Sequence, residues 1–437
     1  MKQIILSVLM AWCVASPGFS QHKDSIRLFW EACDYTEVLR LTDGMSAEDG
    51  EMMDWRLQAC RATSDWKEAE RVLRRRLATD SLRVRTWAEL AECYRRQGRL
   101  ECSAEAFRRA VVLRPRAGFL RTGYVQCLLD LSEAQKAKTA CHDWLAADST
   151  SATAYRMLGQ AYEMEDSIPY AFLGYNAAYR LDSLDAQTVA RIANIFNLNQ
   201  QYADAENITA TYRCTDTLNL DVNRQHAKAL CLQQKYPEAI ARYEALKRMG
   251  DRSFLTCYYL GMAYYGDNWF YGAYDNLKLA SKRNPPDINT LYYLGLSAAR
   301  TSWKEEGVAC LEQALKLAIP SDSLIAKLYD GLGECKGRAG DVPGKVAALK
   351  KSYSYSHQNK TLFSIARLYD SLKDTKNAVR YYERFMKQVP DDERYLLDEN
   401  GEVDAKGMTH WQEAYRRVRQ LKEQLFFEGE SDDHKRQ

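Results

Sequence analysis

Apolar residues recur at helical spacing along most of the chain, in blocks separated by short polar segments. Within a block, one stripe follows the spacing i, i+3, i+4 and i+7, and a second stripe follows after a short break. This spacing is typical of two amphipathic helices joined by a tight turn. In one such block the first stripe is Trp87, Leu90, Ala91 and Tyr94, the break is Gly98, and the second stripe contains Phe107 and Ala110.

The block repeats with a period of 34 residues. Stepping by 34 from Ser81 reaches helix-starting or helix-ending residues: Pro115, Ser149, Ser183, Thr217, Asp251 and Pro285. The small residue of the first stripe recurs as Ala91, Gly159, Ala193, Ala227, Gly261 and Gly295, and the second stripe carries Ala171, Ala205, Ala239 and Ala273. We expect these small residues to let the two helices approach closely. Neither helix buries its stripe alone, so successive blocks must stack.

Another block reads Tyr155, Leu158, Gly159 and Tyr162, and then Ala171 and Tyr175. At a 34-residue period this pattern resembles the tetratricopeptide repeat. The resemblance covers residues 22 to 390, with about eleven units that begin near residues 19, 50, 84, 118, 152, 186, 220, 254, 288, 326 and 359. The first two are degenerate, and a four-residue slip near 320–323 precedes the tenth. The resemblance implies an all-α, right-handed α-solenoid with a concave face.

The chain ends outside this pattern. Residues 391–407 are predicted to be a loop, 408–427 an amphipathic helix that caps the solenoid (21–390), and 428–437 a charged, disordered tail.

The first twenty residues are typical of a secretory signal peptide. Lys2 precedes an apolar run from Ile4 to Val14, and 15–20 supplies small residues and a proline. Cleavage is predicted before Gln21, with an earlier site after Ala15 as an alternative. A lipoprotein cysteine at Cys13, disfavoured by the bulky Trp12, and an uncleaved first helix are the other interpretations.

No later segment approaches the roughly 20 apolar residues of a membrane span. We therefore expect an exported, periplasmic protein, with secretion or outer-membrane association as alternatives. A short signal ending in Ser20–Gln21 ahead of degenerate repeats resembles periplasmic proteins of Bacteroidota.

Composition narrows the function classes. Glycine and proline contribute only 22 and 9 of 437 residues, which disfavours a many-stranded sandwich or barrel. A net charge of +2 does not point to nucleic acid. The six histidines are scattered, and the sequence has no CxxC pair and no nucleophile or phosphate-loop motif. We therefore expect that the protein is not an enzyme and holds no cofactor or metal.

Twelve cysteines become eleven once the signal is removed. Several fall at helix-packing positions, so mostly free, buried thiols are predicted. The best disulfide candidate pairs Cys93 with Cys102 across a predicted turn.

The resemblance implies that a ligand lies along the first helices, at places one, five and eight residues after the tryptophan-like position. Units five to seven then present a polar set, and units eight and nine an aromatic one, although tyrosine is also a common filler in such repeats. The implied residues are Arg156, Gln160, Glu163, Asn194, Asn197, Arg224 and Lys228, followed by Tyr258, Met262, Tyr265, Tyr292 and Leu296.

Residues 61–121 contain sixteen Lys or Arg against eight Asp or Glu. This excess indicates either a solvated surface or docking of an acidic protein or an anionic glycan or lipid. The sequence thus predicts a non-enzymatic scaffold or adaptor of the bacterial envelope that binds a protein or peptide in its concave groove. The alternative is docking of an anionic envelope glycan or lipid by the Arg-rich 61–121 face.

Overall fold

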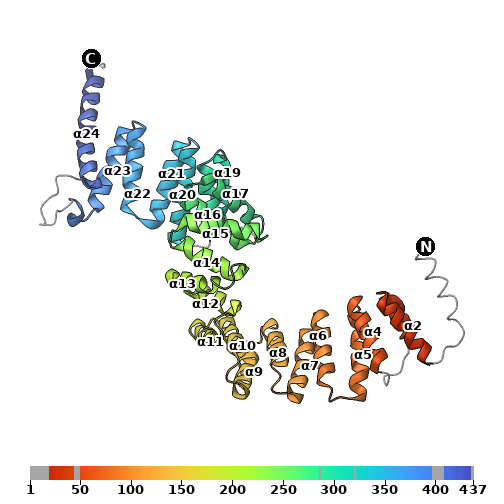
Figure 1. Cartoon of the computed structure of the whole chain (residues 1–437). Helices are drawn as coiled ribbons and strands as arrows, with labels where there is room; N and C mark the ends of the chain where they lie inside the picture. Colours follow the sequence, from red (N-terminus) through yellow and green to blue (C-terminus); the bar gives the residue numbers. More distant parts are fainter. Residues whose placement is uncertain (1–18, 44–49, 285–286, 319–320, 396–407, 435–437) are drawn as a thin grey trace, which may run out of the picture. The chain divides into compact units, whose positions relative to one another are not determined.

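The computed structural model describes residues 19–43, 50–284, 287–318, 321–395 and 408–434. These residues form 23 α-helices and one short 3-10 helix, η1 (Asp391–Glu393), and they contain no β-strand (Figure 1). The predicted all-α array of helical hairpins is therefore confirmed. The chain divides into two compact units, Met1–Asn199 and Gln200–Gln437.

The first unit contains five hairpins and one further helix, and neighbouring helices pack against each other along the chain. Its helices are α2 (Phe19–Glu31), α3 (Tyr35–Leu41), α4 (Gly50–Ala62), α5 (Trp66–Thr79), α6 (Val84–Arg96), α7 (Leu100–Leu113), α8 (Gly118–Asp130), α9 (Ala134–Ala147), α10 (Ala152–Met164), α11 (Ile168–Leu181) and α12 (Ala186–Leu198).

The second unit begins with α13 and continues with five hairpins and a terminal helix. Its helices are α13 (Tyr202–Arg213), α14 (Leu220–Leu232), α15 (Tyr236–Arg248), α16 (Phe254–Gly266), α17 (Phe270–Ser281), α18 (Ile288–Ala299), α19 (Lys304–Leu317), α20 (Asp322–Arg338), α21 (Val342–Ser356), α22 (Asn359–Ser371), α23 (Thr375–Gln388) and α24 (His410–His434).

Ten of the eleven predicted unit starts coincide with the first residue of a helix. The exception is the tenth unit, which begins at Asp322 and not near residue 326. Its first helix, α20, is 17 residues long, whereas α16 has 13. The four-residue slip is therefore absorbed by a longer helix.

Four of the turns between units carry an Asp-Ser or Asp-Thr pair, at residues 80–81, 148–149, 182–183 and 216–217. Asp80 accepts a hydrogen bond from the backbone N–H of Leu82 at 3.1 Å, and Asp182 accepts one from Leu184 at 3.0 Å. Asp148 and Asp216 make the same bond two residues onward. An aspartate that bonds its own backbone in this way ends one helix and directs the chain to the next.

The turns inside hairpins explain why so little glycine is needed. A left-handed residue with positive φ recurs at 34-residue intervals, and only one of these seven positions holds glycine. They are Ser64, Gly98, Ser132, Asp166, Gln200, Gln234 and Asn268. Aspartate and asparagine, at two of these positions, tolerate this conformation at a modest cost.

Glycines inside the helices have a different role, at the crossings of hairpin helices. A Cβ added to Gly261 would lie 2.5 Å from Leu277 Cγ, and one on Gly159 would lie 2.8 Å from the ring of Tyr175. A Cβ on Gly295 would likewise lie 2.8 Å from Leu311 Cγ. The predicted role of these small residues in close helix packing is confirmed.

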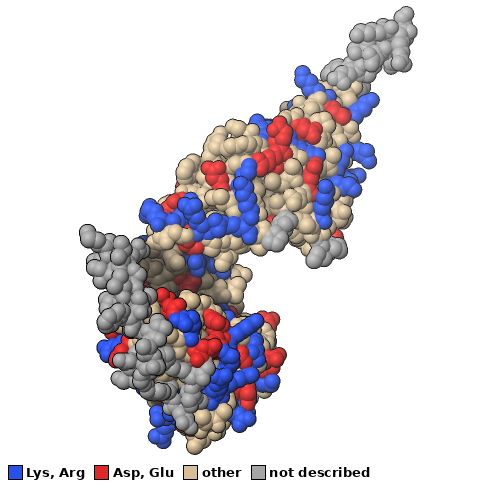
Figure 2. Space-filling view, turned by 90° about the vertical axis from the view of Figure 1, so that its right-hand side faces the viewer, with Lys and Arg blue, Asp and Glu red and all other residues tan. Residues whose placement is uncertain are grey.

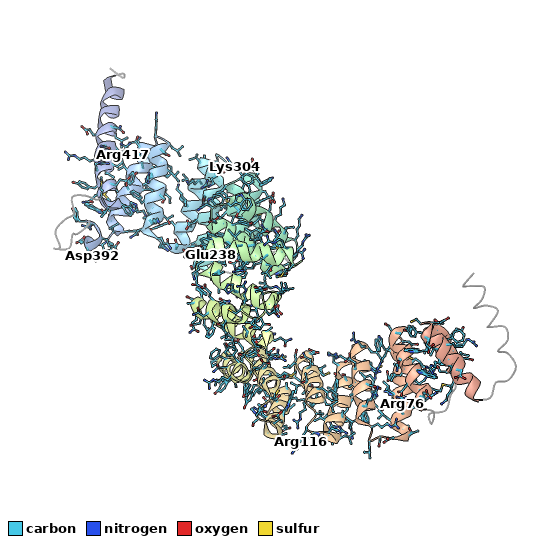
Figure 3. The ribbon with its side chains drawn as sticks, viewed as in Figure 1. Arg76, Arg116, Glu238, Lys304, Asp392 and Arg417 are labelled. Carbon is cyan, nitrogen blue, oxygen red and sulfur yellow. The ribbon has the colours of Figure 1, made fainter. Side chains whose placement is uncertain are left out.

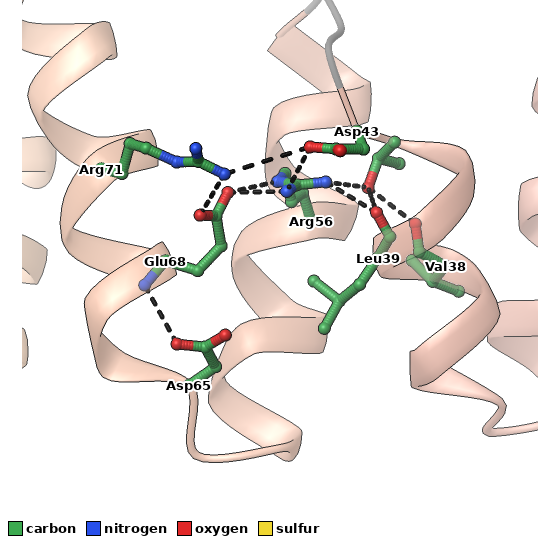
Figure 4. Close-up of polar contacts among 8 residues, drawn as sticks. Val38, Leu39, Asp43, Arg56, Asp65, Glu68 and Arg71 are labelled. Carbon is green, nitrogen blue, oxygen red and sulfur yellow. Dashed lines mark hydrogen bonds and ion pairs between the residues drawn. The ribbon is translucent and has the colours of Figure 1, made fainter.

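A polar network holds the degenerate first hairpins together (Figure 4). Arg56 on α4, only 8% exposed, donates to Glu68 Oε1 on α5 at 2.7 Å and to the carbonyl of Leu39 on α3 at 2.7 Å. It also bonds Asp43 at 3.1 Å, while Arg71 pairs with the other oxygen of Glu68 at 2.5 Å. The buried guanidinium thus has several partners, as a buried charge requires.

At the other end, α24 packs on α23 and is tied to α22. Arg417 donates to both carboxylate oxygens of Asp370, at 2.7 and 2.8 Å, and Ala414, Val418 and Leu421 are buried. The helix continues to His434, so residues 428–434, predicted to be disordered, are helical. Of the predicted loop 391–407, the structure describes only 391–395.

Residues 1–18, which hold most of the predicted signal peptide, lie outside the described residues, and α2 begins at Phe19. Among the described helices, none combines the length and the apolar character that crossing a membrane requires. Within the same residues, no group of three or more His, Cys, Asp or Glu side chains is placed to hold a metal ion.

The eleven cysteines in the described part of the chain are all free, and eight of them are buried. The Cys93–Cys102 disulfide prediction is wrong: Cys93 is buried and donates to the carbonyl of Trp66, whereas Cys102 accepts a hydrogen bond from Arg99. Burial raises the pKa of Cys60 and of Cys141 to about 12. Buried thiols of this kind act as small apolar side chains.

Candidate binding surfaces

The polar site residues predicted in the first unit lie on α10 and α12, and several already have internal partners. Arg156 pairs with Asp185 at 2.9 Å and also donates to Gln187. Glu163 accepts a hydrogen bond from the buried Tyr175 hydroxyl at 2.5 Å and pairs with Arg191 at 3.2 Å. Charges that are compensated internally have less to offer a partner.

The amide residues of this set differ in exposure. Asn197 is only 4% exposed, so its side chain belongs to the interior of the unit. Gln160 and Asn194 are partly exposed. The predicted amide-rich contact surface is therefore reduced to these two side chains.

In the second unit, Arg224 has a structural partner that the sequence did not reveal. Its Nε donates to Asp251 at 2.6 Å, and the Asp251 side chain is 3% exposed. Burial alone would raise the pKa of Asp251, but hydrogen bonds from Arg224, Thr256 and Ser253 outweigh it and lower the pKa to about 2. Arg224 therefore stabilises a buried carboxylate at the start of α16.

Leu296 was predicted to face a ligand, and this prediction is wrong. Its side chain is 4% exposed, and α20 packs on α18. A Cβ on Gly331 of α20 would lie 3.4 Å from Leu296 Cδ2. The longer α20 covers the place that the repeat pattern left open.

The remaining aromatic residues of the predicted site form a cluster of half-buried rings. We call Tyr258 and Tyr259 on α16 with Tyr292 and Tyr293 on α18 the tyrosine belt; Met262 and Tyr265 flank it. Ring centroids lie 5.1 Å apart in the first pair and 5.3 Å apart in the second. Tyr265 lies 5.5 Å from Tyr293. Such rings offer broad contact area at low entropic cost.

Two lysines lie over the belt. Lys228 Nζ is 5.6 Å from the Tyr259 ring centre, and Lys327 Nζ is 5.0 Å from that of Tyr292. Burial raises the pKa of Tyr259 and of Tyr292 to about 12, so both phenols stay protonated. Within the described residues, none of the four belt hydroxyls makes a hydrogen bond to the protein. They remain available as donors and acceptors.

A separate groove of about 1270 Å³ lies in the first unit. The first helices of three successive hairpins, α4, α6 and α8, supply most of its lining. Arg76, which also lines it, lies on α5 (Figure 3). We call it the arginine groove. Its lining includes Arg61, Arg76, Arg83, Arg85, Arg95, Arg96 and Arg114, against Asp54, Glu89 and Glu92.

Carboxylates in the arginine groove are shared. Glu89 pairs with Arg85 at 2.9 Å and with Arg61 at 3.6 Å. Glu92 pairs with Arg95 at 2.8 Å and Arg96 at 3.0 Å. Lysine and arginine side chains also lie beside acidic ones elsewhere on the surface (Figure 2). In the arginine groove, however, Glu89 and Glu92 each pair with two guanidiniums, which leaves a local positive excess, while Asp54 pairs with the buried Arg76 at 2.7 Å.

Apolar side chains line the same groove. Phe119 on α8 is 70% exposed and Leu82, in the turn before α6, is 71% exposed. Trp66 and Phe107 lie deeper in the lining. Large apolar side chains that stay exposed inside a concave surface are typical of binding sites.

Several lining residues of this groove could have been predicted from the repeat pattern. The same places one, five and eight residues after the tryptophan-like position give Ala88, Glu92 and Arg95 in the third unit, and all three line the groove. In the fourth unit they give Thr122 and Gln126, which do so as well. The sequence interpretation placed these inner positions only from the fifth unit onward, and it treated the arginines as a separate face.

Helical hairpins that repeat every 34 residues, with small residues at their crossings, define a helical-repeat protein. A tetratricopeptide repeat model matches residues 47–249, and a second model of the same repeat matches residues 361–394. Together they cover more than half of the chain. The chain belongs to the tetratricopeptide repeat family.

Several solved structures are similar to this chain at low sequence identity. A tetratricopeptide repeat protein from Parabacteroides merdae is 14% identical, with 58% of this chain and 98% of that chain covered and a TM-score of 0.42. The human IFIT1 dimer with PPP-AAAA is 14% identical, with 82% and 94% covered and a TM-score of 0.41. The Cut9–Hcn1 hetero-tetramer of the APC/C is 15% identical, with 84% and 80% covered and a TM-score of 0.42. No match was found among curated proteins.

Proposed function

We propose that this chain is a non-enzymatic scaffold that binds a segment of a partner protein in a groove lined by the first helices of its repeats. Tetratricopeptide repeat proteins are usually protein-binding scaffolds, so the family supports this class of function. The observation that carries the proposal is the arginine groove, in which three successive hairpins leave charged and apolar side chains exposed together.

A peptide segment suits this surface better than a small molecule. The groove volume of about 1270 Å³ exceeds the roughly 300–1,000 Å³ of small-molecule sites. Its lining alternates exposed guanidiniums with apolar side chains, which fits a chain of mixed side chains. The tyrosine belt is a second surface of the kind that binds peptides, and we propose it as an additional contact region.

We propose further that the scaffold acts in the bacterial envelope. The support is the sequence pattern of residues 1–20, which lies mostly outside the described residues. Fractionation of cells expressing the full chain with a C-terminal tag tests this. We expect the tagged protein in the periplasmic fraction with Gln21 as its first residue; a full-length protein in the cytosol would contradict export.

The second candidate function is docking of an anionic envelope glycan or lipid by residues 61–121. The seven arginines of the groove favour it, because guanidinium groups bind phosphate and carboxylate bidentately. An anionic glycan without apolar groups would leave the exposed Phe119 and Leu82 in water. Sedimentation with vesicles containing anionic lipid, set against protein capture, separates the two functions.

Affinity capture from an envelope extract tests the scaffold function. The groove variant is Leu82→Asp/Phe119→Asp, and the belt variant is Tyr258→Ala/Tyr292→Ala, which leaves the structural Arg224 intact. Leu184→Asp is a matched control: Leu184 has the same place in the turn as Leu82, is 57% exposed and lies outside the groove lining.

We expect wild type and Leu184→Asp to retain the same proteins, and the groove variant to lose at least one of them. Retention of every partner by both the groove and the belt variants would contradict the assignment. Circular dichroism of each variant checks that the helices are retained.

A further inference from the structure

We infer that the arginine groove takes an acidic, extended segment that also carries an apolar side chain. This inference rests on the proposed scaffold function and adds the chemistry of the partner. The observations behind it are the sharing of carboxylates among arginines, the exposure of those arginines, and the apolar side chains beside them.

The charges of the groove favour an acidic ligand. Glu89 lies between Arg85 and Arg61, and Glu92 lies between Arg95 and Arg96. Each cluster therefore holds two positive charges and one negative charge. A carboxylate from a partner would complete each cluster, and a guanidinium–carboxylate hydrogen bond is stronger than a neutral one.

The arginines of these clusters are more exposed than the carboxylate of the first cluster. The side chain of Arg85 is 85% exposed and that of Arg96 is 60% exposed, whereas that of Glu89 is 13% exposed. The positive groups thus face solvent while the acceptor of the first cluster is largely covered. A ligand entering the groove meets guanidinium groups first, and a like-charged segment would be repelled.

The third observation is the apolar part of the surface. Phe119 and Leu82 are about 70% exposed, which is costly unless a partner covers them. A polyanion without apolar groups would leave both side chains in water. An acidic peptide with an aromatic or aliphatic residue covers them and completes the arginine clusters at the same time.

Geometry sets the length of the segment. Arg85 and Arg96 stand in the first and last turns of α6, so their Cα atoms are separated by about 16 Å along the helix axis. An extended chain advances about 3.3 Å per residue. Acidic side chains roughly five residues apart would therefore reach both clusters, and no terminal carboxylate is needed.

The chain provides a matched control on the same unit. On α7, Glu105 is shared by Arg108 at 2.7 Å and Arg109 at 3.0 Å, the same arrangement as Glu92 with Arg95 and Arg96. These residues do not line the arginine groove. Two double variants thus remove equal charge from the two sites. Arg95→Gln/Arg96→Gln removes it from the groove, and Arg108→Gln/Arg109→Gln removes it from α7, outside the groove.

The experiment is selection of displayed peptides on the full chain. Random 12-residue peptides are joined through their C-termini to a phage coat protein, which removes the free carboxylate. The library is selected on four proteins: wild type, Arg95→Gln/Arg96→Gln (the groove pair variant), Phe119→Ala, and Arg108→Gln/Arg109→Gln (the α7 control). Peptides that wild type enriches are synthesised with amidated C-termini, and their Kd is measured by fluorescence polarisation.

We expect enrichment of Asp and Glu together with an aromatic or aliphatic residue. Binding should weaken about tenfold in the groove pair variant and stay within about twofold in the α7 control. It should also weaken in Phe119→Ala. Replacing the acidic residues of the peptide by their amides should weaken binding to wild type by a similar factor, and raising the salt should do the same.

The two proposals fail in different ways. Enriched peptides without net negative charge that still depend on Phe119 would overturn the acidic partner and leave the scaffold function standing. Enriched peptides that bind all variants equally would overturn binding in this groove. Anionic phosphatidylglycerol vesicles that bind through Arg95 and Arg96, with no peptide enriched, would assign the groove to a lipid headgroup.

Discussion

The two units use one scaffold and expose different chemistry on it. In the first unit, α4, α6 and α8 line a groove rich in arginine, with Phe119 and Leu82 exposed. In the second unit, α16 and α18 carry four half-buried tyrosines. The buried stripe of each hairpin is nearly the same in both. The comparison shows that packing residues fix the fold, while the neighbouring stripe is free to determine what each unit binds.

Charge has different roles in the two units. In the groove, Arg85 and Arg96 are exposed and share their carboxylates with Arg61 and Arg95, so they are available to a partner. In the second unit, Arg224 neutralises the buried Asp251, and His226 is itself buried. Replacing Arg85 should therefore affect binding, and replacing Arg224 should affect stability.

The largest expected effect is on the helix crossing that supports the tyrosine belt. Gly261→Leu should lower the free energy of unfolding by about 3 kcal/mol, because its Cβ would lie 2.5 Å from Leu277 Cγ. Urea denaturation followed by circular dichroism measures the loss. Gly50→Leu is the control, since among the described residues, apart from its chain neighbours and the backbone of its own helix, no atom lies within 4 Å of a Cβ there. Equal melting of Gly261→Leu and wild type would show that the packing register is wrong.

The next effect separates the two kinds of arginine. Arg224→Gln should cost about 2–3 kcal/mol, because it leaves the carboxylate of Asp251 buried without its charged partner. Arg85→Gln should cost less than about 0.5 kcal/mol, since that side chain is exposed. Adding Asp251→Asn to Arg224→Gln should restore part of the loss. Equal losses in both single variants would remove the distinction between structural and available arginines.

Acid should weaken the second unit selectively. Burial, with Arg213 and Arg242 nearby, lowers the pKa of His226 from 6.5 to about 4, and the ring bonds Thr209 at 2.9 Å. Since the unfolded chain binds the proton more tightly, stability is complete above pH 6.5 and falls toward pH 4. At pH 5 we expect a loss of about 2 kcal/mol.

Hydrogen exchange of α13 and α14 at pH 7 and pH 5, corrected for intrinsic rates, measures this loss. His226→Gln should remove the dependence on pH between these values. A variant that keeps the full dependence would assign it to other groups. No described side chain of the first unit is a buried histidine, so α6 and α8 should change little.

The smallest effect concerns tyrosine hydroxyls. Tyr175→Phe should cost about 1.5 kcal/mol, because the Tyr175 hydroxyl donates to Glu163 inside the first unit. Tyr292→Phe should cost less than about 0.5 kcal/mol, since its hydroxyl makes no hydrogen bond among the described residues. Thermal melts of both variants compare them. A large loss in Tyr292→Phe would show that the belt is structural.

Most of the fold follows from the sequence because each repeat places its small residues and turn residues at fixed intervals. Ten of the eleven predicted unit starts match for this reason. The start of unit ten does not match, because α20 lengthens to absorb an insertion. The same lengthening explains the error at Leu296, since packing between non-adjacent helices has no local pattern. The Cys93–Cys102 error arises because spacing alone does not fix side-chain direction.

The site was predicted less well than the fold. The tyrosine belt was found because its residues repeat at the period of the fold. Internal partners of Arg156, Glu163 and Arg224 were not predicted, since each comes from another segment of the chain. The arginine groove was recognised only as a charge excess, although its inner positions follow the same rule.

The most direct test of the central claim is hydrogen exchange of the full chain with and without the acidic peptide selected above. We expect protection of residues 84–96 and 118–130, with lower protection in Arg95→Gln/Arg96→Gln and unchanged protection in Arg108→Gln/Arg109→Gln. Protection confined to residues 254–266 and 288–299, or protection that is equal in all three proteins, would contradict it.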